Sequence, residues 1–295
     1  MKRKSHVKEP LLWNLTCLVL ASISLLGCSR ETPTLLREVP ANDSGLDFAN
    51  TLEESPELNI LNYLYYYNGA GVAIADFNDD GLPDLYLVSN QGADKLFLNE
   101  GALRFRDVTE ASGLLHTGGW TTGVSHADIN GDGREDLYIC KPGGYRALDG
   151  TNRLYINKGT GPDGIPVFEE KAAEFGLDLS TLSTQAAFFD YDLDGDLDAF
   201  LLNHSVHPNR NYGRGRQRES YDPLAGDILL RNDEGYFTDV SEAAGIYQGK
   251  AGYGLGLGIS DLNLDGYPDI YIGNDFFEND YLYLNNGDGT FREVI

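Results

Sequence analysis

Four acidic loops carry the residue types and the spacing of a calcium site. They read DFNDDGLPD (76–84), DINGDGRED (128–136), DYDLDGDLD (190–198) and DLNLDGYPD (261–269). Each loop has carboxylate or amide oxygens at positions 1, 3, 5 and 9, and glycine at position 6. Calcium takes about 6–8 oxygen ligands at flexible distances, so alternating donors let a tight loop close around one ion. Four copies indicate a repeat protein stabilised by metal rather than an enzyme with a single active site.

The predicted ligands are four side chains per loop and the backbone carbonyl of position 7. In chain order they are Asp76, Asn78, Asp80, Leu82 and Asp84; Asp128, Asn130, Asp132, Arg134 and Asp136; Asp190, Asp192, Asp194, Asp196 and Asp198; and Asp261, Asn263, Asp265, Tyr267 and Asp269. The glycine at position 6 is expected to turn the backbone through positive φ. We therefore expect about four structural Ca²⁺ ions, with the tightest binding in the third loop because it is the most acidic.

An EF-hand begins in the same way but needs a bidentate glutamate at position 12. Position 12 is aliphatic in all four loops, where it is Leu87, Ile139, Leu201 and Ile272. The runs LYLV, LYIC, AFLL and IYIG follow position 9 directly, and such runs predict buried strands. The alternative is a set of Asp/Asn/Gly turns without metal. Four aligned copies, each leading into a strand, favour the metal sites.

The repeat extends beyond the loops. A Gly/Ala-rich strand precedes each loop, in the order GAGVAIA, TTGVSHA, STQAAFF and GLGLGIS. After the loop strand comes another strand and a turn, as in KLFLNEG and RLYINKG, and then an aromatic and acidic segment such as FRDVTEASGL. Units of about four short strands that recur roughly every 50–70 residues predict an all-β chain folded as a β-propeller. The alternative is an open β-solenoid.

These segments resemble the FG-GAP/VCBS repeat family, the calcium-loop β-propellers that also occur in integrin α chains. YNGAGVAIADFNDDGLPDLYLVSN, LFLNEG and FRDVTEASGL are most similar to bacterial surface lipoproteins related to cartilage acidic protein, which often carry an ASPIC/UnbV domain. The resemblance covers about 44–295 and implies calcium at the loop positions and no catalytic residues. Family propellers commonly have seven blades, which implies that the propeller of this chain is incomplete and continues beyond Ile295.

The N-terminus has the pattern of an export signal. Basic residues among the first eight precede an apolar stretch at 11–26, and the stretch ends in LLGC at 25–28. This ending resembles a lipobox, in which Cys28 becomes the lipidated first residue. We therefore expect a signal peptide at 1–27, a tether at 28–43 and the propeller at 44–295, in a protein anchored in the outer membrane or at the cell surface. The alternatives are an uncleaved anchor helix and an ordinary secretory signal.

Composition narrows the choice of partner. The formal net charge is −24 and the pI is about 4.4, which disfavours nucleic acid as a partner. After cleavage only Cys28 and Cys140 would remain, so a disulfide framework is not expected. Calcium would then supply the bracing that disulfides give many exported domains.

The insertion at 203–226 is basic within this acidic chain and is the best candidate for a ligand-binding loop. His204, His207, Arg210 and Arg214 could bind an anionic glycan or an acidic protein. The alternative is a solvated insertion that pairs with nearby aspartates. No cysteine or third histidine lies near His204 and His207, which makes a zinc site improbable.

These features predict an exported, lipid-anchored, calcium-binding propeller that binds a glycan or a protein at the cell surface. An alternative is a calcium-dependent, lyase-like enzyme acting on polysaccharide, with His204, His207 and Arg210 as the start of its site. Another is a structural subunit of a surface uptake complex. No nucleophile elbow, phosphate loop or HExxH helix occurs in the sequence, so we expect no enzymatic activity.

Overall fold

The computed structural model describes residues 35–114, 119–207, 220–276 and 278–295. The chain divides into two compact units, Met1–Pro40 and Ala41–Ile295, and the second contains all the described strands. The predicted signal peptide and Cys28 lie outside the described residues. Every helix within the described ranges is too short or too polar to span a bilayer.

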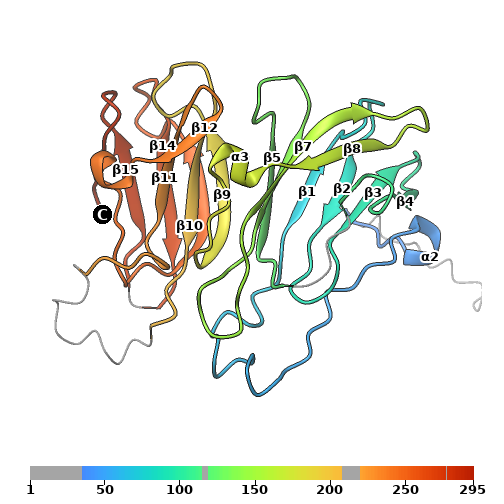
Figure 1. Ribbon diagram of the computed structural model, residues 1–295, viewed down its shortest axis with the longest axis horizontal. Coiled ribbons are helices and arrows are strands. Elements are labelled where there is room, and N and C mark those ends of the chain that lie inside the picture. Colours follow the sequence, from blue (N-terminus) through green and yellow to red (C-terminus); the bar gives the residue numbers. More distant parts are fainter. Residues whose placement is uncertain (1–34, 115–118, 208–219, 277) are drawn as a thin grey trace, which may run out of the picture. The chain divides into compact units, whose positions relative to one another are not determined.

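The second unit is built from four antiparallel sheets of four strands each (Figure 1). The first contains β1 (Val72–Ala75), β2 (Asp84–Leu87), β3 (Lys95–Asn99) and β4 (Phe105–Asp107). The second contains β5 (Gly123–Ala127), β6 (Asp136–Cys140), β7 (Arg153–Thr160) and β8 (Pro166–Glu170). The third contains β9 (Ser183–Phe189), β10 (Asp198–Asn203), β11 (Ile228–Asp233) and β12 (Tyr236–Asp239). The fourth contains β13 (Gly254–Ser260), β14 (Asp269–Asn274), β15 (Tyr281–Asn285) and β16 (Phe291–Glu293).

In each sheet the strands pair in chain order, which is the up-and-down pattern of a propeller blade. The short helices α2 (Ala41–Ser44), α3 (Ala172–Phe175) and α4 (Ser241–Ala244) lie outside the sheets. The prediction of an all-β propeller built from four-stranded units is therefore confirmed.

Successive blades meet through their first strands, because β1 contacts β5, β5 contacts β9, and β9 contacts β13. Glycine at the start of these strands permits the close approach. A Cβ on Gly71 would lie 2.9 Å from the backbone nitrogen of Val124, and one on Gly123 would collide with the carbonyl oxygen of Thr184. The Gly-rich first strands thus reflect packing of backbone against backbone.

The hydrophobic core is distributed between neighbouring blades. One cluster joins Tyr86 and Leu96 of the first blade to Ile139 and Phe168 of the second, and similar clusters lie between the second and third and between the third and fourth blades. All the residues of β6 and β10 are buried because they are covered on both faces. Each blade is therefore stabilised by its neighbours, as in other repeat proteins.

A polar side chain caps the end of the second strand in every blade. The side-chain oxygens of Asp94, Asn152, Asp227 and Asp280 accept the backbone N–H groups of Ser89, Lys141, Asn203 and Asn274, at 2.8, 2.8, 2.9 and 2.9 Å. Burial raises the pKa of Asp227 to about 8. The amide of Asn152 makes the equivalent bond in the second blade, so the position does not require a charge.

Asp227→Asn should therefore remove a pH dependence of the free energy of unfolding. The folded pKa of Asp227 lies above its unfolded value, so the folded state binds more protons between about pH 4 and pH 8 and stability falls as pH rises through this window. The variant should exceed the parent by about 1 kcal/mol or more in free energy of unfolding at pH 8, and by progressively less toward pH 4. Urea unfolding at a series of pH values, at constant free calcium, measures this difference.

Asp280→Asn is the matched control, because Asp280 occupies the same place in the fourth blade and its pKa is lowered. Its effect on stability should be constant between pH 6 and pH 8. An Asp227→Asn effect that is equally flat over this range would contradict the assignment.

Candidate metal centres

Each acidic loop connects the first and second strands of a blade. Position 1 follows the last residue of β1, β5, β9 or β13, and position 9 is the first residue of β2, β6, β10 or β14. In all four blades the antiparallel pair brings these ends together, as in the pairing of Ala75 with Asp84. The loops therefore occupy equivalent places in the four blades.

The aspartate at position 1 organises the turn of its own loop. One carboxylate oxygen accepts the backbone N–H of position 5 and the other accepts that of the position 6 glycine, at 2.7–3.1 Å. The residues that make this contact are Asp76, Asp128, Asp190 and Asp261. The same hydrogen bonds in four loops show that the position 1 carboxylate lies against the backbone of positions 5 and 6 in every loop.

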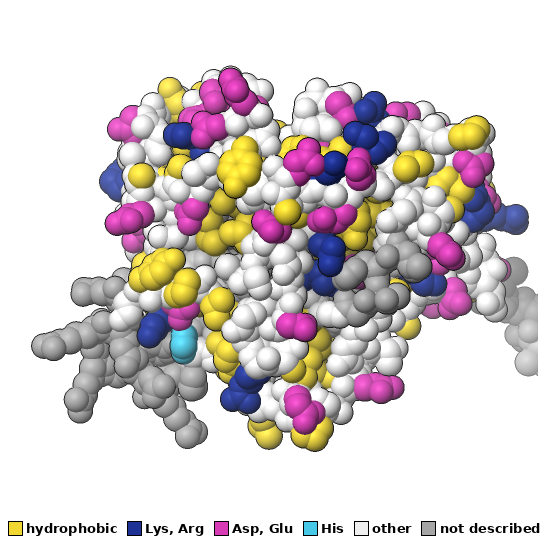
Figure 2. Space-filling model, viewed as in Figure 1, with side chains coloured by type: hydrophobic (Ala, Val, Ile, Leu, Met, Phe, Trp, Pro, Cys, Tyr) yellow, Lys and Arg dark blue, Asp and Glu magenta, His cyan; other side chains and the backbone are white. Residues whose placement is uncertain are grey.

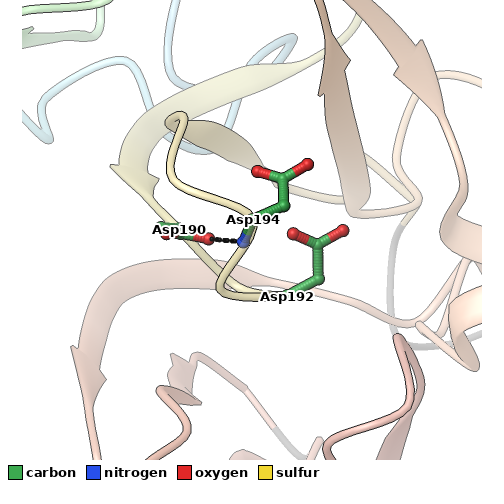
Figure 3. A group of neighbouring side chains, drawn as sticks. All are labelled: Asp190, Asp192 and Asp194. Carbon is green, nitrogen blue, oxygen red and sulfur yellow. Dashed lines mark hydrogen bonds between the residues drawn. The ribbon is translucent and has the colours of Figure 1, made fainter.

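Position 3 distinguishes the third loop from the others. In three loops it is asparagine, and its amide donates to the position 5 carboxylate at 2.8–3.0 Å. In the third loop it is Asp192, and the carboxylates of Asp190, Asp192 and Asp194 each have an oxygen within 4.8 Å of the others (Figure 3). Burial, and then the charges of Asp194 and Asp190, raise the pKa of Asp192.

Three oxygens in these loops are buried but have no hydrogen-bond partner in the described part of the chain. They are the Oδ1 atoms of Asn78, Asp192 and Asp196. Buried polar atoms are nearly always hydrogen-bonded, so unpartnered oxygens beside clustered carboxylates call for a cation. An all-oxygen donor set suits Ca²⁺ better than a transition metal. Asp196 was expected to contribute only its backbone carbonyl. Its unpartnered carboxylate oxygen is a further candidate metal ligand that the sequence did not indicate.

The aspartate at position 9 is buried in every loop and joins the loop to the sheet. The four residues, which are 0% exposed, are Asp84, Asp136, Asp198 and Asp269. One oxygen accepts the N–H of position 2, and the other accepts the N–H of an asparagine in the blade's third strand, at 2.8–3.1 Å. Burial raises the pKa of Asp84 and Asp136 to about 6 and that of Asp198 to about 7. These carboxylates have a structural role, and their role as calcium ligands stays a prediction.

The asparagine in the third strand was not singled out by the sequence analysis. It is Asn99, Asn157, Asn232 or Asn285, and its amide donates to the carbonyl of loop position 8. In two blades the amide also reaches the preceding loop, since Asn157 donates to the carbonyl of Phe77 and Asn285 to that of Tyr191, at 2.9 and 2.8 Å. The recurring asparagine in LFLN, LYIN, LLRN and LYLN was the available signal.

The backbone of the loops uses left-handed conformations at two positions. Gly81, Gly133, Gly195 and Gly266 have φ of +86°, +87°, +105° and +96°, which confirms the expectation for position 6. Position 4 is left-handed as well, although only the second loop has glycine there. Asp79, Leu193 and Leu264 adopt φ of 60°, 62° and 63°, at a cost of about 1–2 kcal/mol each.

The candidate ligand-binding residues of the basic insertion do not form one site among the described residues. His204 is 1% exposed and its Nδ1 lies 3.0 Å from the hydroxyl of Thr184. His207 instead pairs with Asp222, with 2.6 Å between Nε2 and Oδ2. Arg210 and Arg214 lie outside the described residues.

Acidic side chains are scattered among basic ones on the face drawn in Figure 2. The charge of −24 is therefore not gathered into one patch on that face. A large part of it belongs to the four loops, where carboxylates converge locally.

Parts of this chain are similar to known proteins. Residues 76–139, which contain the first two loops, match the FG-GAP-like repeat. Cartilage acidic protein 1 of Xenopus tropicalis is 27% identical over 210 residues, covering 70% of this chain and 29% of that protein. The human and mouse proteins of the same name are each 28% identical over 55% of this chain and 24% of their own length. The chain thus spans less than a third of the length of these relatives.

Mutation should distinguish the buried carboxylate at position 9 from the exposed carboxylate at position 5. Asp198→Asn would set an amide group against one of two backbone N–H donors, so it should lower the free energy of unfolding by about 1–3 kcal/mol even in excess chelator. Asp194→Asn, at exposed position 5, retains an oxygen for the N–H of Asp196 and should have little effect in chelator. Chemical denaturation followed by circular dichroism tests both, and equal effects in chelator would refute the distinction.

Adding a side chain at the loop glycines with positive φ should lower the stability of the protein. Gly266→Ala places Cβ at a φ of +96° and should destabilise the protein by about 1–2 kcal/mol. Gly258→Ala, in the same blade, adds Cβ in open space without a positive φ and is the matched control. Thermal melting of the two variants should differ clearly. Equal melting temperatures would show that the loop accommodates the strain.

Proposed function

The chain carries FG-GAP-like repeats and is related to cartilage acidic protein 1, and we propose that it is a calcium-stabilised β-propeller that binds its partner at the cell surface. The fold and this relationship support a binding or structural role. Calcium, the surface location and the identity of the partner are the proposed parts.

The observation that carries the calcium proposal is the third loop. Its first three aspartates converge within 4.8 Å, and Asp192 and Asp196 each keep a buried oxygen without a hydrogen-bond partner. Carboxylates at this separation repel one another unless a cation lies between them. Asp190, Asp192, Asp194 and the carbonyl of Asp196 would hold the ion, with Asp198 behind them.

The same residue pattern in the other loops extends the proposal to about four ions. Ca²⁺ would neutralise the carboxylates and supply an electrostatic cross-link between positions 1, 3 and 5. Because the loop is already tied to the third strand through position 9, this cross-link would stiffen the whole blade. In two cases it would also reach the next blade through the asparagine amide.

The proposed location follows from the N-terminal sequence. A signal peptide at 1–27 and a lipidated Cys28 would anchor the propeller at the cell envelope. Millimolar external calcium would fill even weak sites, whereas cytosolic calcium would not.

The proposed partner is an anionic glycan or an acidic protein, bound through the basic insertion. His207 lies on this insertion and pairs with Asp222, while Arg210 and Arg214 belong to its part outside the described residues. Arginine forks suit carboxylate groups, and loops displayed by a rigid propeller commonly carry recognition.

Calcium removal should destabilise the protein strongly. A site at 100-fold its dissociation constant contributes about 2.7 kcal/mol, so four occupied sites should raise the melting temperature well above that in excess chelator. Titration calorimetry on the chelated protein should give about four sites. An unchanged melting temperature on chelation would show that the loops are turns without metal.

The double variant Asp190→Asn with Asp194→Asn should lose one site and leave the other three. Both changes lie in the third loop. Asp194→Asn keeps an oxygen for the N–H of Asp196, whereas Asp190→Asn keeps an oxygen for only one of the N–H groups of Asp194 and Gly195, so the double variant should also be less stable in chelator. The count of sites by calorimetry or by native mass spectrometry is the readout. An unaltered count would remove the third loop from the proposed set.

A further inference from the structure

A cavity of about 530 Å³ lies where the first strands of all four blades begin. Val72 of β1, Val124 of β5, Thr184 of β9 and Leu255 of β13 contribute to its wall. Tyr63 and Tyr65, from the segment before β1, and His204, directly after β10, complete the lining. The cavity therefore lies at the strand ends that are opposite the acidic loops, because each loop follows the other end of the first strand.

Three polar atoms at this cavity are buried and lack a partner among the described residues. They are the hydroxyl oxygens of Tyr63 and Tyr65 and the Nε2 atom of His204. The three side chains are 1%, 5% and 1% exposed. Buried polar groups almost always find a hydrogen-bond partner, so three unsatisfied groups around one cavity point to a polar occupant.

The hydrogen-bond character of these groups can be read from their neighbours. Thr184 has one hydroxyl proton and two neighbouring acceptors, the carbonyl of Gly254 at 3.3 Å and Nδ1 of His204 at 3.0 Å. Nε2 of His204 is therefore an acceptor or a donor according to which of the two takes that proton. Burial lowers the pKa of His204 to about 3, so the ring is neutral. The cavity thus presents two hydroxyl groups and one nitrogen of a neutral imidazole.

The lining excludes charged ligands. Among the residues that the structure describes, the lining contains no aspartate, glutamate, lysine or arginine, although the whole chain carries 22 Lys and Arg and 46 Asp and Glu. Its remaining polar groups are the amides of Asn68 and Gln185 and the hydroxyls of Thr122 and Thr184. A charged ligand would be desolvated without a counter-charge, which is costly.

Two other occupants fit poorly. Zinc requires several ionised or imidazole ligands, and a single histidine with two neutral phenols does not provide them. A quaternary ammonium group suits aromatic walls but cannot hydrogen-bond, so it would leave all three polar atoms unsatisfied. A hydroxyl group both donates and accepts, and can therefore satisfy phenols and Nε2 together.

We propose that this cavity binds a neutral hydroxylated ring compound of one or two sugar units. The rings of Tyr65 and His204, with centroids 4.2 Å apart, and that of Tyr63, 5.4 Å from His204, pack against one another and fix the positions of the three polar atoms. The volume falls within the roughly 300–1,000 Å³ range of small-molecule pockets. The proposal rests on the proposed binding function and adds a second site, which shares His204 with the basic insertion.

The test uses the full chain saturated with calcium and a panel of neutral mono- and disaccharides. Glucuronate and choline serve as charged probes. Titration calorimetry and saturation-transfer NMR should detect one site for at least one neutral sugar and none for either charged probe. Tyr63→Phe and Tyr65→Phe keep the rings and remove only the hydroxyls, so each should weaken sugar binding roughly three- to tenfold.

Tyr86→Phe is the matched control. Tyr86 also has a buried, unpartnered hydroxyl and is 0% exposed, but it lies in the core between the first two blades and does not line the cavity. Removal of the Tyr86 hydroxyl should leave sugar affinity unchanged.

Several results would overturn the proposal while leaving the calcium sites intact. The first is that no neutral sugar binds to a protein that calcium still stabilises. The second is that a charged probe binds more tightly than the neutral sugars. The third is that Tyr63→Phe, Tyr65→Phe and the parent bind sugar with equal affinity. A protein that calcium does not stabilise but that binds sugar with the expected variant effects would support the cavity and refute the calcium proposal.

Discussion

The hydrogen bonds of the position 9 carboxylates are the constraint on which the rest of this structure depends. Each of Asp84, Asp136, Asp198 and Asp269 is fully buried and accepts two backbone N–H groups, one from its loop and one from the third strand. A buried carboxylate is stable only when it is well satisfied, so this geometry specifies both the loop and the sheet around it. The carboxylates at positions 1, 3 and 5 are then brought together as a consequence.

This arrangement assigns opposite tasks to the two ends of each first strand. At one end lie the carboxylates of the acidic loops, where we propose a cation. At the other end, neutral aromatic and hydroxyl groups line a cavity. Neighbouring blades approach each other through backbone atoms at the start of these strands, as at Gly71 and Gly123. The proposed metal sites and the proposed small-molecule site are thus separated by the length of a strand.

The sequence was a good guide wherever a pattern repeated. The loop spacing, the strands around it and the left-handed glycine at position 6 were all predicted, because four aligned copies reveal which positions are constrained. Position 4 was missed because Leu193 and Leu264 have no preference for the left-handed region, and the hydrogen bonds of the loop impose it.

The tyrosine segment was missed for a different reason. Tyr63, Tyr65 and Tyr66 occur once in the chain, before the first repeat, and pack against Trp120 and His204 from other blades. Contacts between residues so far apart in sequence leave no periodic signal. His204 was expected in an exposed binding loop, whereas its ring is enclosed by these tyrosines. The sequence marked His204 as a candidate binding residue but did not indicate which side chains surround it.

The asparagine amides that cross between blades have a consequence for the order of assembly. The carbonyl of Phe77 in the first loop is held by Asn157 in the second blade's third strand, and that of Tyr191 in the third loop by Asn285 of the fourth blade. These two loops are therefore completed by residues that are synthesised some 80 and 94 positions later. In a chain that emerges from its N-terminus, the first loop reaches its final form only when the second blade is nearly finished, so ion capture would follow folding with a delay of one blade.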